Sequence, residues 1–139
     1  MHYRKILLTI HVLPAILCIL SCSLTEKKED VKVIGFAYKG DLIIITSNKK
    51  NILRSSITGV EDENGICSFN QRINLDFKKE DAKLNILAYS RGIKVLDTLL
   101  SISKNSKEPF ISFIYPSMAK RKNRSVFIAD ATDSNYIKY

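Results

Sequence analysis

CSFNQRINLDF, the stretch from Cys67 to Phe77, alternates between apolar and polar side chains almost without interruption. One set of alternate positions holds Cys67, Phe69, Ile73, Leu75 and Phe77, and only Gln71 breaks it. The other set holds Ser68, Asn70, Arg72, Asn74 and Asp76. Because successive side chains of a strand point to opposite faces, this pattern predicts a strand with one face in a core and one in water. Cys67 is then a small buried apolar residue rather than a reactive thiol.

A turn signal stands immediately before this strand. Asn64-Gly65 is a strong hairpin signal, because both residues accept a positive φ. Three carboxylates, Glu61 to Glu63, precede it and could suggest a calcium site. Their spacing does not match an EF-hand loop, which needs oxygen ligands at alternating positions and a final glutamate. We therefore interpret the segment as a turn.

Further strands are expected on both sides of Cys67–Phe77. The predicted runs are Val31–Tyr38, Leu42–Thr46, Ile52–Thr58, Lys83–Tyr89, Ile93–Ser103, Phe110–Tyr115 and Val126–Ala129, with a frayed edge strand at Tyr136–Tyr139. Lys83–Tyr89 and Ile93–Ser103 read as a hairpin, and their apolar residues on both faces predict a central position. Short strands with frequent turns and no convincing helix predict an all-β fold. The expected architecture is a small antiparallel β-sandwich, Ig-like or transthyretin-like, with a small open β-barrel as the alternative.

The first residues have the composition of a secretory leader. Arg4 and Lys5 give a basic start, Ile6 to Leu20 contains no formal charge, and the small Ser21 follows. These three parts together predict a signal peptide over residues 1–21. A retained transmembrane helix needs about 20 apolar residues, and Pro14 would break or kink it.

Ile19-Leu20-Ser21-Cys22 resembles the lipobox of bacterial lipoprotein precursors. The resemblance covers the leader alone, and it implies that Cys22 is lipidated and becomes the mature N-terminus. Residues 22–30 are then a polar, lipid-anchored tether, and residues 31–139 form a single domain. Ordinary cleavage nearby is the alternative, and it would give a soluble secreted or periplasmic protein.

Composition narrows the chemistry of the mature chain. His2 and His11 both belong to the leader, so Ser-His-Asp and Cys-His mechanisms and the usual catalytic zinc sites are excluded. Cys18 leaves with the leader and Cys22 would carry lipid, so Cys67 has no disulfide partner in the chain. We expect no enzymatic activity, no cofactor and no metal. Without Arg4 and Lys5, 20 basic side chains face 14 acidic ones, which gives a net charge of +6.

A basic run is the one candidate binding site. Lys120, Arg121, Lys122 and Arg124 lie between two predicted strands. They read either as an anion-binding loop for lipid headgroups, lipopolysaccharide phosphates or an acidic protein, or as a solvated loop that keeps the protein soluble. Because the signal peptide predicts export from the cytoplasm, nucleic acid is not expected as the ligand of this basic run. Asp130, Asp133 and Asn135 could supply oxygen ligands, but such residues also simply form turns.

These observations predict a membrane-anchored lipoprotein of the bacterial cell envelope, on either the inner or the outer membrane. It would act as a non-enzymatic adaptor or structural binding domain with an envelope protein as its partner. The alternative is a ligand-binding or inhibitor module that recognises an anionic ligand or an envelope enzyme.

Overall fold

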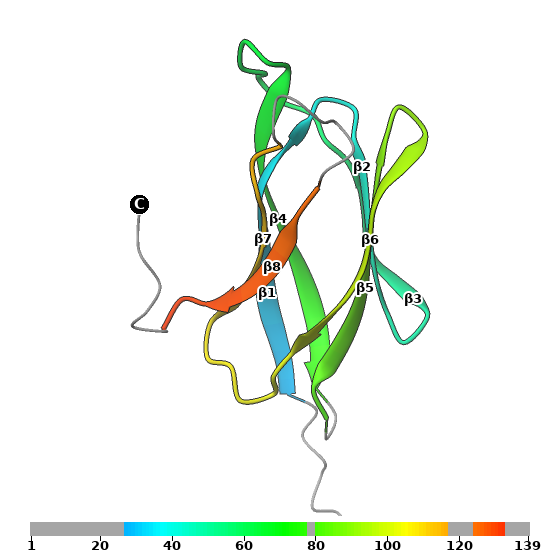
Figure 1. Ribbon diagram of the computed structural model, residues 1–139. Helices are drawn as coiled ribbons and strands as arrows, with labels where there is room; N and C mark the ends of the chain where they lie inside the picture. The colour runs from blue at the N-terminus through cyan, green and yellow to red at the C-terminus, as the bar shows by residue number, and fades with distance from the viewer. Residues whose placement is uncertain (1–26, 78–79, 117–123, 133–139) are drawn as a thin grey trace, which may run out of the picture.

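The described part of the chain forms eight strands in two four-stranded sheets that pack face to face (Figure 1). The computed structural model describes residues 27–77, 80–116 and 124–132. The strands are β1 (Lys27–Tyr38), β2 (Leu42–Ser47), β3 (Lys50–Ser56), β4 (Ile66–Phe77), β5 (Ala82–Ser90), β6 (Ile93–Ile102), β7 (Pro109–Phe113) and β8 (Val126–Asp130). None of the described segments forms a helix long and apolar enough to cross a membrane.

The sheets are ordered β4-β1-β7-β8 and β3-β2-β5-β6, and they do not close into a barrel. Every strand pair is antiparallel except β1 with β7, which is parallel. The predicted all-β sandwich is confirmed. An immunoglobulin constant-type domain divides seven strands as four and three, whereas the strands described here divide as four and four.

The alternation predicted for Cys67–Phe77 is confirmed, with Phe69 half-buried against the core. In β4 the side chains of Cys67, Ile73, Leu75 and Phe77 are buried, and all five polar alternates are exposed. The strand pairs with β1 along twelve residues, from Lys27 opposite Phe77 to Tyr38 opposite Ile66. The core between the sheets is aliphatic, with buried members including Val31, Val33, Ile43, Ile45, Ile57, Ile73, Leu75, Leu84, Ile86, Ile102 and Ile111.

Gly35 lets β1 and β7 approach each other. Its φ is +136°, and a Cβ added there would lie 2.2 Å from the carbonyl oxygen of Phe113. Real Cβ atoms do not approach a backbone oxygen so closely, so another residue would push the paired strands apart. The position therefore requires glycine for space as well as for its backbone angle.

The turn at Asn64-Gly65 differs from what the sequence suggests. Gly65 has a φ of +74°, but Asn64 is not in the positive-φ region. The Gly65 amide donates to the Asp62 carbonyl (3.0 Å) and the Asp62 amide donates to that of Ile66 (2.8 Å), so the loop has three residues. Two-residue turns with a positive φ at both positions occur instead at Asn48-Lys49, between β2 and β3, and at Arg91-Gly92, between β5 and β6.

The tether predicted for residues 22–30 is wrong for its last four residues. Strand β1 begins at Lys27, and Lys27–Asp30 pairs with Asn74–Phe77. Backbone pairing with β4 does not require apolar alternation, and Arg72 forms an exposed ion pair with Asp30 across the two strands. The segment therefore looks like a linker in sequence but continues the sheet.

The central position predicted for Ile93–Ser103 is also wrong. β5 is central, but β6 is the edge strand of its sheet. Ile93 is 63% exposed and Leu99 is 76% exposed. Because β6 lies at the edge of its sheet, some of its apolar side chains are exposed to water. The strand predicted at Tyr136–Tyr139 lies outside the described residues.

Candidate functional site

Four segments that are distant in sequence meet at one end of the sandwich, here called the Asp41 end. They are the turn Lys39–Asp41, residues 57–66, residues 114–116 and Arg124. Backbone hydrogen bonds tie them together: Gly40 N–H donates to the Ile57 carbonyl (2.8 Å), and Ile57 N–H donates to that of Asp41 (2.7 Å). The Ile114 amide donates to the Ser125 carbonyl (3.0 Å). These bonds fix the loops relative to the sheets.

A buried ion pair lies at the centre of this end. Arg124 Nη2 donates to Asp41 Oδ2 over 2.9 Å, and the two side chains are 2% and 3% exposed. The same carboxylate oxygen accepts the backbone N–H of Tyr38 (3.2 Å), and the Arg124 guanidinium lies 4.7 Å from the centre of the Tyr38 ring. Burying a charge without a partner costs free energy, and the contacts with Asp41 and Tyr38 offset that cost. Arg124 therefore has a structural role in this end of the sandwich.

This burial changes the interpretation of the predicted basic loop. Lys120, Arg121 and Lys122 lie outside the described residues. Arg124 is not an exposed cation, because an internal carboxylate neutralises it. The sequence carries no signal for the pairing: Asp41 follows Lys39-Gly40 and reads as a turn residue, and 82 residues separate it from Arg124.

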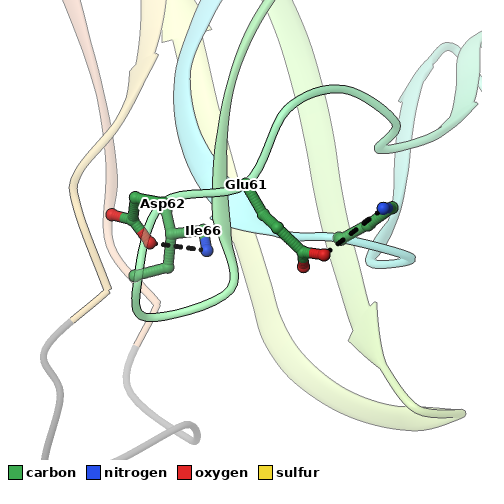
Figure 2. A network of polar contacts seen from close by, with 4 residues as sticks. Glu61, Asp62 and Ile66 are labelled. Carbon is green, nitrogen blue, oxygen red and sulfur yellow. Dashed lines mark hydrogen bonds and ion pairs between the residues drawn. The ribbon is translucent and has the colours of Figure 1, made fainter.

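The acidic run before β4 is held by groups of the protein itself. Asp62 Oδ1 accepts the backbone N–H groups of Asn64 (2.8 Å) and Ile66 (3.0 Å), and Oδ2 accepts the hydroxyl of Tyr115 (2.6 Å). Figure 2 shows the bond to Ile66 and, beside it, an ion pair formed by Glu61. The partner of Glu61 in this pair is Lys39, at 3.4 Å. Within the described residues, no group of three or more acidic, histidine or cysteine side chains is placed to hold a metal.

The hydrogen bond between the Tyr115 hydroxyl and the Asp62 carboxylate shifts the pKa of both groups. The hydrogen bond from Tyr115, followed by that from the Ile66 amide, lowers the pKa of Asp62 below its ordinary value. The same bond raises the pKa of Tyr115. Both effects favour one arrangement, a tyrosine that donates to a carboxylate, and this holds the Tyr115 ring in place.

The Tyr115 ring belongs to a group of apolar side chains on the outer face of the β4-β1-β7-β8 sheet. It packs edge-on against Phe36, with ring centres 5.4 Å apart. The exposed members are Phe36 (41%), Ile114 (49%), Tyr115 (40%) and Phe127 (39%). The half-buried Ile34 completes the set. We call these five residues the exposed apolar surface.

Strand register places part of this surface on three neighbouring strands, with the half-buried Ser112 between Ile34 and Phe127. Ile34 lies opposite Ser112 of β7, and Ser112 lies opposite Phe127 of β8. Phe36 is two residues further along β1, beside the Tyr115 ring. Val33, Ile111 and Ile128 point into or pack on the core, so their neighbours Ile34, Ser112 and Phe127 face outward.

Charged side chains lie on the same face of β1 and β4, nearer the start of β1. Asp30 and Lys32 precede Ile34 on β1, and Arg72 and Asp76 lie on β4. All four side chains are exposed, and Arg72 pairs with Asp30. The boundary between apolar and charged halves therefore crosses β1 between Lys32 and Ile34.

The Asp130 carboxylate stabilises the turn that follows β8, which is the role that the sequence suggested for it. Its carboxylate accepts the backbone N–H of Lys107 (2.8 Å), Glu108 (3.3 Å) and Thr132 (3.0 Å), and the Thr132 hydroxyl (2.7 Å). These bonds, with the Thr132 hydroxyl first, lower its pKa to about 2. Asp133 and Asn135 lie outside the described residues. Cys67 is buried, in agreement with a structural role.

Comparison with known proteins yields no relative. No protein-family model matches the chain, and neither the curated proteins nor the solved structures contain a match.

Proposed function

We propose that the chain is a lipid-anchored, non-enzymatic domain of the bacterial cell envelope that binds a protein partner through its exposed apolar surface. The leader supports the anchor, since a basic start, an apolar run and Ser21-Cys22 follow one another at the N-terminus. Cys22 lies outside the described residues, so the anchor rests on the sequence.

The observation that carries the binding role is the exposed apolar surface. Three aromatic rings and two isoleucines are gathered on one sheet face, although the same strands carry charged residues nearby. Large exposed apolar patches are rare on soluble monomers and often mark interaction sites, whereas single exposed apolar residues are normal. Aromatic residues are also enriched at the centres of protein–protein interfaces. The Asp62–Tyr115 bond holds one of these rings in place before a partner arrives.

An anion-binding or inhibitor module is the other proposal that the sequence raised. One of its four cations, Arg124, is buried against Asp41 and is not available to a ligand. The adaptor role therefore has the better support.

Affinity isolation tests the binding role. The full lipoprotein, tagged at its C-terminus, is recovered from envelopes solubilised in mild detergent, and its co-purifying proteins are quantified. We expect one protein in near-stoichiometric amount, lost from the double variant Phe36→Ser, Phe127→Ser. The matched control, Asn74→Ser with Asp76→Ser, changes two exposed residues on the same sheet face and should retain it. Equal recovery with both double variants would exclude the surface as the binding site.

Metabolic labelling tests the anchor separately. A fatty acid should be incorporated into the wild-type protein and not into Cys22→Ala. Equal labelling of the two proteins would exclude lipidation at Cys22.

A further inference from the structure

The direction of β1 sets how the sandwich can stand on a membrane. β1 begins at Lys27 and ends at the Asp41 end. The β2–β3 turn at residues 48–49, residues 80–81 and the loop at residues 103–108 lie at the opposite end, called the Lys27 end (Figure 1). A lipid on Cys22 would therefore be attached next to the Lys27 end.

The linking segment is short compared with the domain. Five residue steps separate Cys22 from Lys27, and a fully extended chain spans at most about 18 Å over that length. From Lys27 to Phe36 the strand runs on for nine residues, which is roughly 30 Å at the rise of a β-strand. The segment between Cys22 and Lys27 is thus too short for the domain to turn over and place its Asp41 end on the bilayer.

We infer that the domain stands with its Lys27 end toward the bilayer and holds the exposed apolar surface outward, so that this surface meets a protein and not the anchoring membrane. This inference rests on the proposed lipidation of Cys22.

The charge pattern of the sheet face argues against the other posture, in which the domain lies on this face. Asp30, Lys32, Arg72 and Asp76 share the face with the apolar residues. If the rings of Phe36 and Phe127 entered the hydrocarbon, these charges would be drawn toward it, at a high desolvation cost. A protein partner needs to cover the apolar half alone.

Energy transfer from the domain to lipid measures the posture. The full lipoprotein is reconstituted into phosphatidylethanolamine–phosphatidylglycerol vesicles that contain a rhodamine-labelled lipid as acceptor. A thiol-reactive donor is placed at Asn105→Cys, in the loop at the Lys27 end, or at Val60→Cys, in an exposed loop of the Asp41 end. The native Cys67 is buried and Cys22 carries the lipid, so each variant offers one accessible thiol.

We expect transfer from residue 60 to be about twofold or more weaker than from residue 105, since roughly a strand length separates the two ends. Equal transfer, or stronger transfer from residue 60, would overturn the posture while leaving the anchor intact. Loss of flotation with the vesicles would overturn the anchor itself, and with it this inference. The variant Phe36→Ser, Phe127→Ser should leave both signals unchanged, and a change would show that the apolar surface touches lipid.

Discussion

β1 and β4 are paired along twelve residues, yet their outward-facing side chains differ in kind. Along β4 every outward residue from Ser68 to Asp76 is polar. Along β1 the outward row is charged at Asp30 and Lys32, and then becomes apolar at Ile34 and Phe36. Ile34 is half-buried but Phe36 is 41% exposed, so burial in the domain does not account for the aromatic ring at position 36. The proposed binding role rests on this apolar half of β1 and its neighbours.

The largest effect is expected at Gly35, which lies in β1 between the two outward apolar residues Ile34 and Phe36. Gly35→Ala places a Cβ against the Phe113 backbone, and overpacking and backbone strain together should destabilise the protein by about 4 kcal/mol. Gly40→Ala is the matched control: its φ is also positive, at +83°, but nothing lies within 4 Å of the added Cβ. Urea denaturation of both variants measures the difference, and equal costs would contradict the close approach of β1 and β7.

The buried ion pair comes next. Asp41→Ala leaves Arg124 charged and buried without its carboxylate, which should cost roughly 3–5 kcal/mol in the free energy of unfolding. The exposed pair of Lys94 and Asp97 is the control, and Asp97→Ala should cost less than about 1 kcal/mol. If both substitutions cost the same, the Asp41 end is not organised around this pair.

Neighbouring residues of β4 provide a third test. Leu75 is buried and Asn74 is exposed, so Leu75→Ala should cost about 2–5 kcal/mol. Asn74→Ala should stay within about 0.5 kcal/mol of the wild type. Thermal or chemical unfolding of the two variants decides the point, and reversed costs would place β4 in the opposite register.

The sequence predicted β4 well because its alternation is almost complete, so one face had to be buried. The sequence-based prediction failed where the pattern of apolar and polar residues does not determine whether a segment pairs with a strand, or where a strand lies in its sheet. Lys27–Asp30 extends β1 through backbone pairing alone, and β6 is apolar on both faces although it is an edge strand. The candidate site was the least predictable part. Its members Phe36, Tyr115 and Asp62 come from different strands and loops, and only the fold brings them together.

The smallest effect concerns protonation at the edge of the apolar surface. Tyr115→Phe removes the main cause of the lowered pKa of Asp62, so this pKa should rise toward its ordinary value. A lowered carboxyl pKa stabilises the fold above about pH 4, and this contribution is lost as the pH falls through the folded-state pKa. Carboxyl titration by NMR measures it, with Asp130 at about 2 as an unchanged internal reference. An unaltered Asp62 would mean that the Tyr115 bond is absent in solution.

The most direct test of the proposed binding role is site-specific photo-crosslinking in living cells, with the crosslinker placed in turn at Phe36, Phe127, Asn74 and Asp76. All four positions are exposed on one face of one sheet, so accessibility is comparable. If the apolar half of this face binds a protein, Phe36 and Phe127 will give one common crosslinked product, and Asn74 and Asp76 will give none. Products of equal yield from all four positions, or a product from Asn74 and Asp76 alone, would contradict a binding role for the exposed apolar surface.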